Sequence, residues 1–247
     1  MKDVFGTTPY PWQKTVIAHL CLMQLKDSGV PAAPTILVRP TGGGKSSVRD
    51  VAAFMNGGVS LTITPLLSLG ADQEEKINSK ANQAFGPVVA IHLDEIRTYH
   101  EQRVCIASIL NESNKTNVTI LLFSSPQAIV RPNSLWLPFL LGLVGNNRLT
   151  LLCIDEVHLF VNFGLSFRDE FRQLTEVLFC KLHVPGNKFV TKVPMLFMTA
   201  TCTKFIVEQV ERIIDIRFRP NVNVFWPDPS EMGHRHVYLE TNYTTKP

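Results

Sequence analysis

The stretch Thr35-Ile-Leu-Val-Arg-Pro-Thr-Gly-Gly-Gly-Lys-Ser-Ser47 decides the fold of this chain. Its first part is an apolar run that predicts a buried strand, and its second part places three glycines before a lysine and a hydroxyl residue. Because glycines adopt backbone angles closed to other residues, successive N–H groups in such a loop can turn inward around phosphate oxygens. A strand, this loop and a following helix therefore predict a binding site for a nucleoside triphosphate.

The residues that follow the glycines have distinct expected roles. Lys45 would reach the β- and γ-phosphates, and Ser46 would offer its hydroxyl to Mg²⁺. Arg39 stands where the strict G-x-x-x-x-G-K-[ST] pattern has glycine. A flexible glycine-rich linker is the alternative interpretation, but the strand before the loop and the helical pattern after it favour the phosphate site.

Composition sets the outer limits. With 247 residues, of which 45% are hydrophobic and 18% charged, the chain can bury one large core. A net charge of +3 is compatible with nucleic acid but does not require it. Five widely spaced cysteines form no C-x-x-C pair, so we expect reduced core residues rather than a zinc site or disulfides. No apolar run approaches the roughly 20 residues that span a bilayer, so we expect a soluble intracellular protein, nuclear in a eukaryote and cytoplasmic otherwise.

Short β-branched runs alternate with longer segments of helical period, which predicts a three-layer α/β fold: a parallel sheet with helices on both faces. We expect strands over residues 35–39, 59–64, 88–92, 118–123, 150–155, 194–199 and 222–226. We expect helices over residues 12–26, 45–55, 66–82, 97–111, 166–181 and 203–214. One domain over residues 1–230 and a C-terminal tail or linker over 231–247 account for the chain.

An acidic pair, Asp155 and Glu156, follows the apolar strand at 151–154. Ligands of such sheets bind at the carboxyl ends of the strands, so this pair should lie beside the glycine loop. Asp155 would hold Mg²⁺ through water, and Glu156 would orient and deprotonate an attacking water. A solvated turn is the alternative interpretation, which the apolar run ahead of the pair disfavours.

Asp155-Glu-Val-His158 resembles the D-E-x-H box of superfamily 2 helicases, and Thr41-Gly-Gly-Gly-Lys-Ser46 resembles their first motif in the form found in RecQ-like DNA helicases. The resemblance implies the first RecA-like lobe of such a helicase, a P-loop NTPase fold with ATP and Mg²⁺ as cofactors. It further implies that the phosphates are bound by Thr41, Gly42, Gly43, Gly44, Lys45 and Ser46. Asp155, Glu156, His158 and Lys45 would then carry catalysis, with His158 as a bridge.

Two further segments resemble motifs of the same family. Tyr10-Pro-Trp-Gln13 resembles the entry motif, in which the glutamine recognises adenine and an aromatic residue lies near the base, so Gln13 and Tyr10 take these roles. Thr199-Ala-Thr201 resembles the T-A-T motif, which links the nucleotide state to strand binding. Thr199 and Thr201 are therefore expected to couple the two events.

Nucleic acid is the expected partner, most simply single-stranded or partly duplex DNA. Thr64-Pro-Leu-Leu-Ser-Leu69 resembles a segment that touches the nucleic-acid backbone, and this assigns Pro65 and Ser68 to the interface. Leu121-Leu-Phe-Ser-Ser-Pro126 resembles the segment that follows it in the family and adds Pro126.

The stretch from His158 to Arg168 resembles the aromatic-rich loop of RecQ helicases, which senses single-stranded DNA. Phe163 and Phe167 could stack on bases, and Arg168 could pair with phosphate or with the acidic box. The alternative is a core stripe of phenylalanines at helical spacing. We favour the loop for Phe163 and Phe167, and the core for Phe160.

The sequence departs from the family pattern at several positions, and these departures limit the activity that the resemblance implies. Phe163, Leu165 and Ser166 stand where the aromatic-rich loop has tryptophan, histidine and aspartate, so polar groups that carry the coupling are missing. We also expect no second lobe. In helicases of this class the second lobe supplies an arginine finger, a group that raises the rate about 10³- to 10⁵-fold in related NTPases. For this chain, such a lobe would come in trans or from a longer gene product. Nucleotide binding and slow hydrolysis are expected of this chain alone, but not unwinding.

Three functions are consistent with these residues. The first is the ATP-binding lobe of a RecQ-like 3′–5′ DNA helicase. The second is a degenerate nucleic-acid-binding or regulatory module that keeps the fold without motor activity. The third, a P-loop phosphotransferase, explains neither the D-E-x-H box nor the T-A-T segment.

Overall fold

A computed structural model describes residues 8–25, 28–65, 74–75, 77–78, 87–113, 118–162, 165–220 and 222–227. Its centre is a seven-stranded sheet in the order β3-β4-β2-β5-β8-β1-β9, in which every pairing is parallel. The strands are β1 (Pro34–Val38), β2 (Gly58–Ile63), β3 (Val88–His92), β4 (Thr119–Ser124), β5 (Leu149–Ile154), β8 (Met195–Thr199) and β9 (Val224–Phe225). All seven expected strands are therefore present, and the expected α/β class is confirmed.

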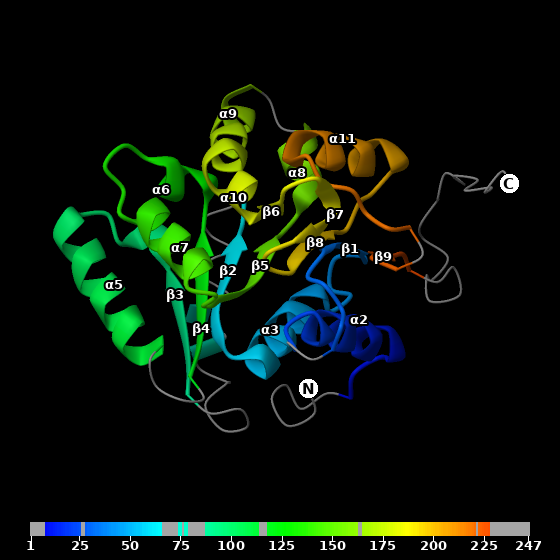
Figure 1. Cartoon of the computed structure of the whole chain (residues 1–247), viewed down its shortest axis with the longest axis horizontal. Helices are drawn as coiled ribbons and strands as arrows, with labels where there is room; N and C mark the ends of the chain where they lie inside the picture. The colour runs from blue at the N-terminus through cyan, green and yellow to red at the C-terminus, as the bar shows by residue number, and fades with distance from the viewer. Residues whose placement is uncertain are drawn as a thin grey trace, which may run out of the picture.

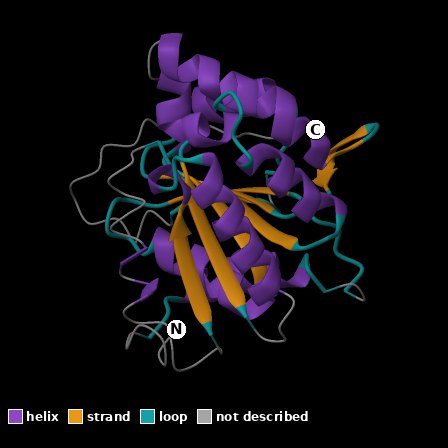
Figure 2. Cartoon of the chain, turned by 90° about the vertical axis from the view of Figure 1, so that its left-hand side faces the viewer, coloured by secondary structure: helices purple, strands orange, loops and turns teal. Residues whose placement is uncertain are grey.

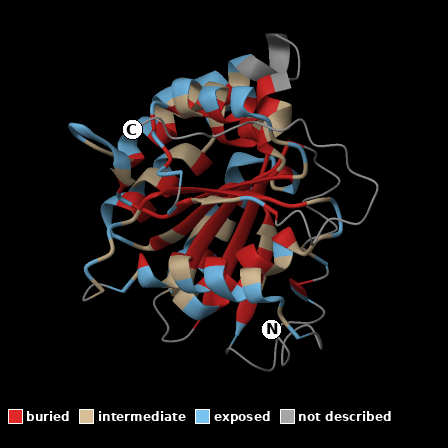
Figure 3. Cartoon of the chain, turned by 90° about the vertical axis from the view of Figure 1, so that its right-hand side faces the viewer, coloured by how far each residue is buried: buried red, intermediate tan, exposed pale blue. Residues whose placement is uncertain are grey.

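Helices cover both faces of the sheet, as Figures 1 and 2 show. On one face lie α2 (Pro11–Leu22) and α3 (Lys45–Asn56), whose apolar side chains share a buried cluster with Leu37, Leu121 and Leu196 of the sheet. The other face carries α5 (Tyr99–Ser113), α6 (Pro126–Val130), α7 (Trp136–Gly145), α8 (Val157–Asn162), α9 (Leu165–Leu174) and α11 (Lys204–Ile214). The central strands are consequently buried on both sides, which Figure 3 shows in red.

One pair of helices was not expected from the sequence. The sequence predicts no helix over residues 126–145, but the structure has α6 and α7 within this range. The buried residues of α7 follow the helical pattern i, i+3, i+4, i+7, i+8: Trp136, Phe139, Leu140, Leu143 and Val144. Pro138 does not break α7 because it lies in the first turn, where a missing N–H costs nothing.

The helix expected over residues 166–181 is in fact three consecutive segments. These are α9, a π-helical turn η2 (Thr175–Phe179) and α10 (Cys180–Leu182). A small antiparallel hairpin of β6 (His183–Val184) and β7 (Asn187–Thr191), also not expected, follows at once. The helix expected over residues 66–82 lies mostly outside the described residues.

The cysteines are free, as expected, but they do not all lie in the core. Cys153 is buried, whereas Cys180 is exposed. Burial raises the pKa of the Cys21 thiol to about 11 and that of the Cys202 thiol to about 12. In the part of the chain that the structure describes, no helix combines the length and apolarity needed to cross a membrane.

Candidate functional site

The glycine loop connects β1 to α3 at the carboxyl edge of the sheet. Gly42 and Gly44 have φ values of 76° and 86°, in the left-handed region that favours glycine. Gly44 is also the N-cap of α3, where no side chain caps the helix. The first backbone N–H groups of α3 thus have no side-chain acceptor at their cap, and such a terminus attracts anions.

Lys45 is held inside this loop, with 7% of its surface exposed. Its Nζ donates hydrogen bonds to the carbonyl oxygens of Arg39 (2.9 Å) and Pro40 (3.3 Å). Burial lowers the pKa of Lys45, while the nearby carboxylates of Glu156 and Asp155 act in the opposite direction. The lysine therefore sits among acceptors that a phosphate oxygen can replace.

Arg39 departs from the strict loop pattern for a reason that the sequence did not reveal. Its guanidinium lies 4.3 Å from the ring centroid of Trp12 in α2, a cation–π contact. Arg39 therefore connects the loop to α2, whereas the glycine of the strict pattern would give the backbone conformational freedom.

Gln13 joins the same helix to the loop from the other side. It is 3% exposed, and its Nε2 donates to the carbonyl oxygen of Gly44 at 3.2 Å. Its Oε1 accepts a hydrogen bond from the backbone N–H of Tyr10 at 2.9 Å, which caps α2. The Tyr10 ring is 62% exposed and stacks on Trp12. The structure thus places Gln13 of the expected entry motif against the glycine loop, and Tyr10 at the start of the same helix.

The acidic pair lies where β5 ends. Asp155 is 5% exposed, and its Oδ1 accepts the backbone N–H of Glu156 at 3.0 Å. Glu156 has a φ of 45°, which is rare for a residue with a side chain. Its Oε1 lies 3.9 Å from Nζ of Lys45. The predicted meeting of the acidic pair with the glycine loop is thus present in the structure.

His158 connects the acidic pair to β8. Its Nδ1 lies 2.8 Å from Oγ1 of Thr199 and 3.3 Å from Oε2 of Glu156. The Thr199 hydroxyl donates to the carbonyl oxygen of Thr201 at 2.7 Å, so we assign Nδ1 of His158 as the N–H donor. Burial lowers the pKa of His158, with Glu156 acting in the opposite direction and Lys45 in the same one. We call Lys45, Glu156, His158 and Thr199 the nucleotide-side cluster.

A buried ion pair lies behind this cluster. Arg49 of α3 is 1% exposed, its Nε donates to Oδ1 of Asp50 at 2.7 Å, and its guanidinium lies 5.0 Å from the centroid of the Phe123 ring. The charge of Asp155 is among those that raise the pKa of Arg49 against the effect of burial. Two adjacent charges on a helix gave no sign of this arrangement in the sequence.

The expected nucleic-acid residues are only partly described. Pro65 follows the end of β2, and Pro126 is the first residue of α6 after β4; both are buried. Ser68 and Phe163 lie outside the described residues, as do the side chains of Phe167 and Arg168 in α9. Phe160 belongs to the core, as expected: it is 1% exposed and stacks on Phe171 with centroids 4.1 Å apart.

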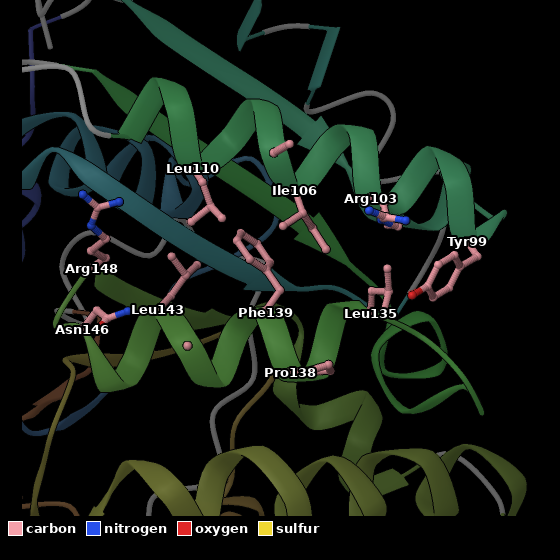
Figure 4. Close-up of a pocket in the computed structure, with 12 residues that line it drawn as sticks. Tyr99, Arg103, Ile106, Leu110, Leu135, Pro138, Phe139, Leu143, Asn146 and Arg148 are labelled. Atoms are coloured by element: carbon pink, nitrogen blue, oxygen red, sulfur yellow. The ribbon is translucent and has the colours of Figure 1, made fainter.

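A groove of about 920 Å³ lies elsewhere, between α5 and α7 (Figure 4). Its middle is apolar, with Ile106, Leu110 and Phe139, and arginines stand at both ends. None of its lining residues belongs to the glycine loop or to the acidic pair.

The chain is similar to helicases in sequence. The sequence model of the DEAD/DEAH box helicase family matches residues 10–209. The chain is 25% identical over 183 residues to the probable ATP-dependent DNA helicase RecS of Bacillus subtilis, covering 74% of this chain and 32% of RecS. It is 26% identical to ATP-dependent DNA helicase Q1 of Mus musculus, covering 72% of this chain and 24% of that protein. The RecQ-like DNA helicase BLM of Xenopus laevis is 29% identical, over 70% of this chain and 11% of BLM.

The chain therefore spans a third or less of the length of these relatives.

Two solved structures are similar in fold. The Hef helicase domain of Pyrococcus furiosus has a TM-score of 0.51 at 16% identity, covering 92% of this chain and 38% of that one. RecG bound to a three-way DNA junction has a TM-score of 0.51 at 15% identity, covering 92% and 26%.

Proposed function

Because this chain belongs to the DEAD/DEAH box helicase family, we propose that it is the ATP-binding lobe of a RecQ-like DNA helicase. The observation that carries the proposal is the nucleotide-side cluster, a continuous set of contacts from the glycine loop to the segment after β8. Lys45 approaches Glu156, Glu156 approaches His158, and His158 bonds to Thr199. We take residues 1–230 as the lobe.

The loop and its surroundings fit ATP with Mg²⁺. The two left-handed glycines and the α3 N-terminus without a side-chain cap supply backbone N–H groups for phosphate oxygens, and Lys45 supplies a positive charge. Ser46 and Asp155 would hold Mg²⁺, which prefers oxygen ligands and neutralises phosphate charge when bound. Gln13 and Tyr10 would receive the adenine, with Thr41 and Gly43 completing the phosphate contacts.

Glu156 is the proposed general base. Its carboxylate would accept a proton from the water that attacks the γ-phosphate, and ADP and phosphate would result. The backbone N–H of Ala200 donates to Oε2 of Glu156 at 3.3 Å, and His158 faces the same oxygen. Glu156 therefore contacts the segment 199–201 directly at Ala200 and indirectly through His158, which bonds to Thr199. These contacts support the proposed coupling of hydrolysis to strand binding.

DNA is the proposed partner, at the carboxyl ends of β2 and β4 and along the stretch from 158 to 168. Pro65, Ser68, Pro126, Phe163, Phe167 and Arg168 are the proposed contacts. Unwinding in the 3′–5′ direction would require a second RecA-like lobe, in trans or in a longer gene product, because translocation needs two lobes that move against each other.

The test is ATP hydrolysis by the chain with a second lobe supplied, with and without single-stranded DNA. Glu156→Gln should lower the rate about 10²- to 10⁴-fold, as loss of a general base does, while binding of a fluorescent ATP analogue persists. Glu208→Gln is the matched control, since Glu208 lies exposed on α11. Nucleotide binding without turnover in the wild-type chain would favour a regulatory module that has kept the fold but lost motor activity.

A further inference from the structure

A second histidine lies at the same edge of the sheet, at the end of β3. His92 is the last residue of that strand, and the short 3₁₀ helix η1 (Leu93–Glu95) follows it. Three carboxylates surround its ring: Asp94 and Glu95 from η1, and Glu74 from a helical segment before β3. We call Glu74, His92, Asp94 and Glu95 the β3-end cluster, and it shares no residue with the nucleotide-side cluster.

The ring of His92 is buried without a hydrogen-bond partner. The residue is 3% exposed, and both ring nitrogens are buried and make no hydrogen bond. Nε2 lies 3.5 Å from Oδ2 of Asp94, and Nδ1 lies 3.6 Å from Oε1 of Glu95. Such a polar ring normally has its hydrogen bonds satisfied, so its orientation toward carboxylates needs an explanation.

Asp94 is fixed by the residue that follows β4. Its Oδ2 accepts the backbone N–H of Ser125 at 2.8 Å, and the Ser125 hydroxyl donates to its Oδ1. A carboxylate held in this way, 3.5 Å from Nε2, favours the proton on that nitrogen, which leaves the lone pair of Nδ1 facing Glu95. Histidines that bind metal ions are oriented by carboxylates in the same manner.

Glu74 reaches the cluster because its segment docks along the edge of β3. Asn78 makes a reciprocal pair with the backbone of Ala90, at 3.0 and 3.1 Å, and Ile77 is buried. Glu74 precedes Asn78 by four residues in the chain. One ligand atom each of Glu74, His92 and Glu95 then lie within 4.8 Å of one another. Burial raises the pKa of Glu74, and the charge of Glu95 acts in the same direction.

Within the described ranges, these acids have no basic side chain as an ion-pair partner other than His92. Among the described residues, no lysine or arginine forms an ion pair with Glu74, Asp94 or Glu95. The contacts to His92 are also longer than the 2.7 to 2.9 Å of a typical charge-assisted hydrogen bond. The contact between Nδ1 and Glu95 matches another geometry: two ligand atoms about 2.0 to 2.2 Å from a tetrahedral ion lie roughly 3.3 to 3.6 Å apart.

We propose that the β3-end cluster binds a divalent transition-metal ion such as Zn²⁺, through Nδ1 of His92 and one oxygen each of Glu74 and Glu95. Imidazole nitrogen in the ligand set favours such an ion over Mg²⁺, which prefers oxygen ligands alone. Asp94 is a positioning residue that holds His92. The Glu95 side chain is 65% exposed, so a fourth coordination position faces solvent and is open to water or an anionic ligand.

The test is a titration of the full chain with Co²⁺, followed by visible absorption in excess Mg²⁺, which occupies oxygen-only sites. One Co²⁺ should bind per chain, with the weak bands of nitrogen and oxygen ligands and no thiolate charge-transfer band. Glu95→Gln should weaken Co²⁺ binding at least about 10-fold, and Asp94→Asn about 10- to 100-fold. Glu75→Gln is the matched control, because Glu75 is exposed, adjacent to Glu74 and outside the cluster.

Three results would overturn the proposal: no Co²⁺ bound in excess Mg²⁺, a thiolate band, or equal affinity in the wild type and Glu95→Gln. Thermal unfolding without added metal shows that each variant is folded. The readout involves neither ATP nor DNA, so its outcome is independent of the proposed helicase function.

Discussion

The nucleotide-side cluster and the β3-end cluster place a histidine beside carboxylates at one edge of one sheet, but they balance charge differently. In the first, Glu156 lies 3.9 Å from Lys45, and His158 has the Thr199 hydroxyl at 2.8 Å. In the second, His92 faces carboxylates at 3.5 and 3.6 Å, and neither ring nitrogen has a hydrogen bond.

The difference shows how similar residues acquire different uses. A lysine inside the first cluster provides a positive charge, which suits the proposed anionic ligand and the proposed action of the acids on a phosphate. The second cluster is acidic and lacks a described basic partner, so it attracts a cation instead. Both clusters contain a histidine, so the residue that distinguishes them is the lysine of the first.

Removing that lysine should have the largest effect. Lys45→Met leaves Glu156 without its cation and should weaken binding of a fluorescent ATP analogue about 10- to 100-fold, since hydrogen bonds to charged groups contribute about 1.5 to 3 kcal/mol. Lys14→Met, on the exposed side of α2, is the control and should bind as the wild type does. Unchanged affinity in Lys45→Met would remove the main distinction between the clusters.

Neutralising the fixed acid of the other cluster should affect stability. Asp94→Asn replaces an acceptor of two Ser125 hydrogen bonds with an amide that cannot accept both, and should lower the free energy of unfolding by about 1 to 3 kcal/mol. Urea denaturation measures the change. Asp169→Asn on exposed α9 is the control, and an equal loss there would show that charge removal alone is responsible.

The hydroxyl partner of His158 should contribute less. Thr199→Val keeps the shape of the residue but removes the oxygen that bonds to Nδ1 of His158, so we expect a loss of about 1 kcal/mol in unfolding free energy. The ring resonances of His158 in NMR spectra should shift at the same time. If those resonances stay in place, the link between the acidic pair and β8 does not run through this hydroxyl.

The smallest effect concerns pH. Because burial lowers the pKa of His158, the folded chain binds this proton less tightly than the unfolded chain does. The contribution of His158 to the free energy of unfolding is therefore present above about pH 6.5, and it decreases as the pH falls through the lowered pKa of this residue. His158→Gln should make the decrease shallower in urea titrations, without abolishing it, since burial also lowers the pKa of His19 and His183. A steeper decrease in the variant would contradict the sign.

The sequence was sufficient for the sheet and for the meeting of its motifs. Buried β-branched runs predicted all seven strands, because parallel strands covered on both faces have no polar alternation to obscure them. Lys45 and Glu156 were expected near one another because each follows a strand at the carboxyl edge. The resemblance of their segments to helicase motifs added Gln13, His158 and Thr199.

Contacts between segments of no shared motif could not be predicted in this way. The β3-end cluster brings Glu74 to His92, and Ser125 fixes its Asp94. Residues 74, 92 and 125 have no characteristic spacing in the chain. The stacking of Arg39 on Trp12 likewise joins a loop to a helix far from it in sequence. The signal for α7 was present in the sequence as apolar residues at helical spacing, but no helix was predicted there.

The backbone at Glu156 has a consequence for how the chain can vary. A left-handed conformation costs a residue with a side chain roughly 1 to 2 kcal/mol, and glycine would relieve that cost. Glycine would also remove the carboxylate that forms the contacts with both Lys45 and His158. At this position, selection for an easily folded chain and selection for chemistry favour different amino acids. A lineage that no longer needed hydrolysis would therefore be free to replace Glu156 early and become more stable by doing so.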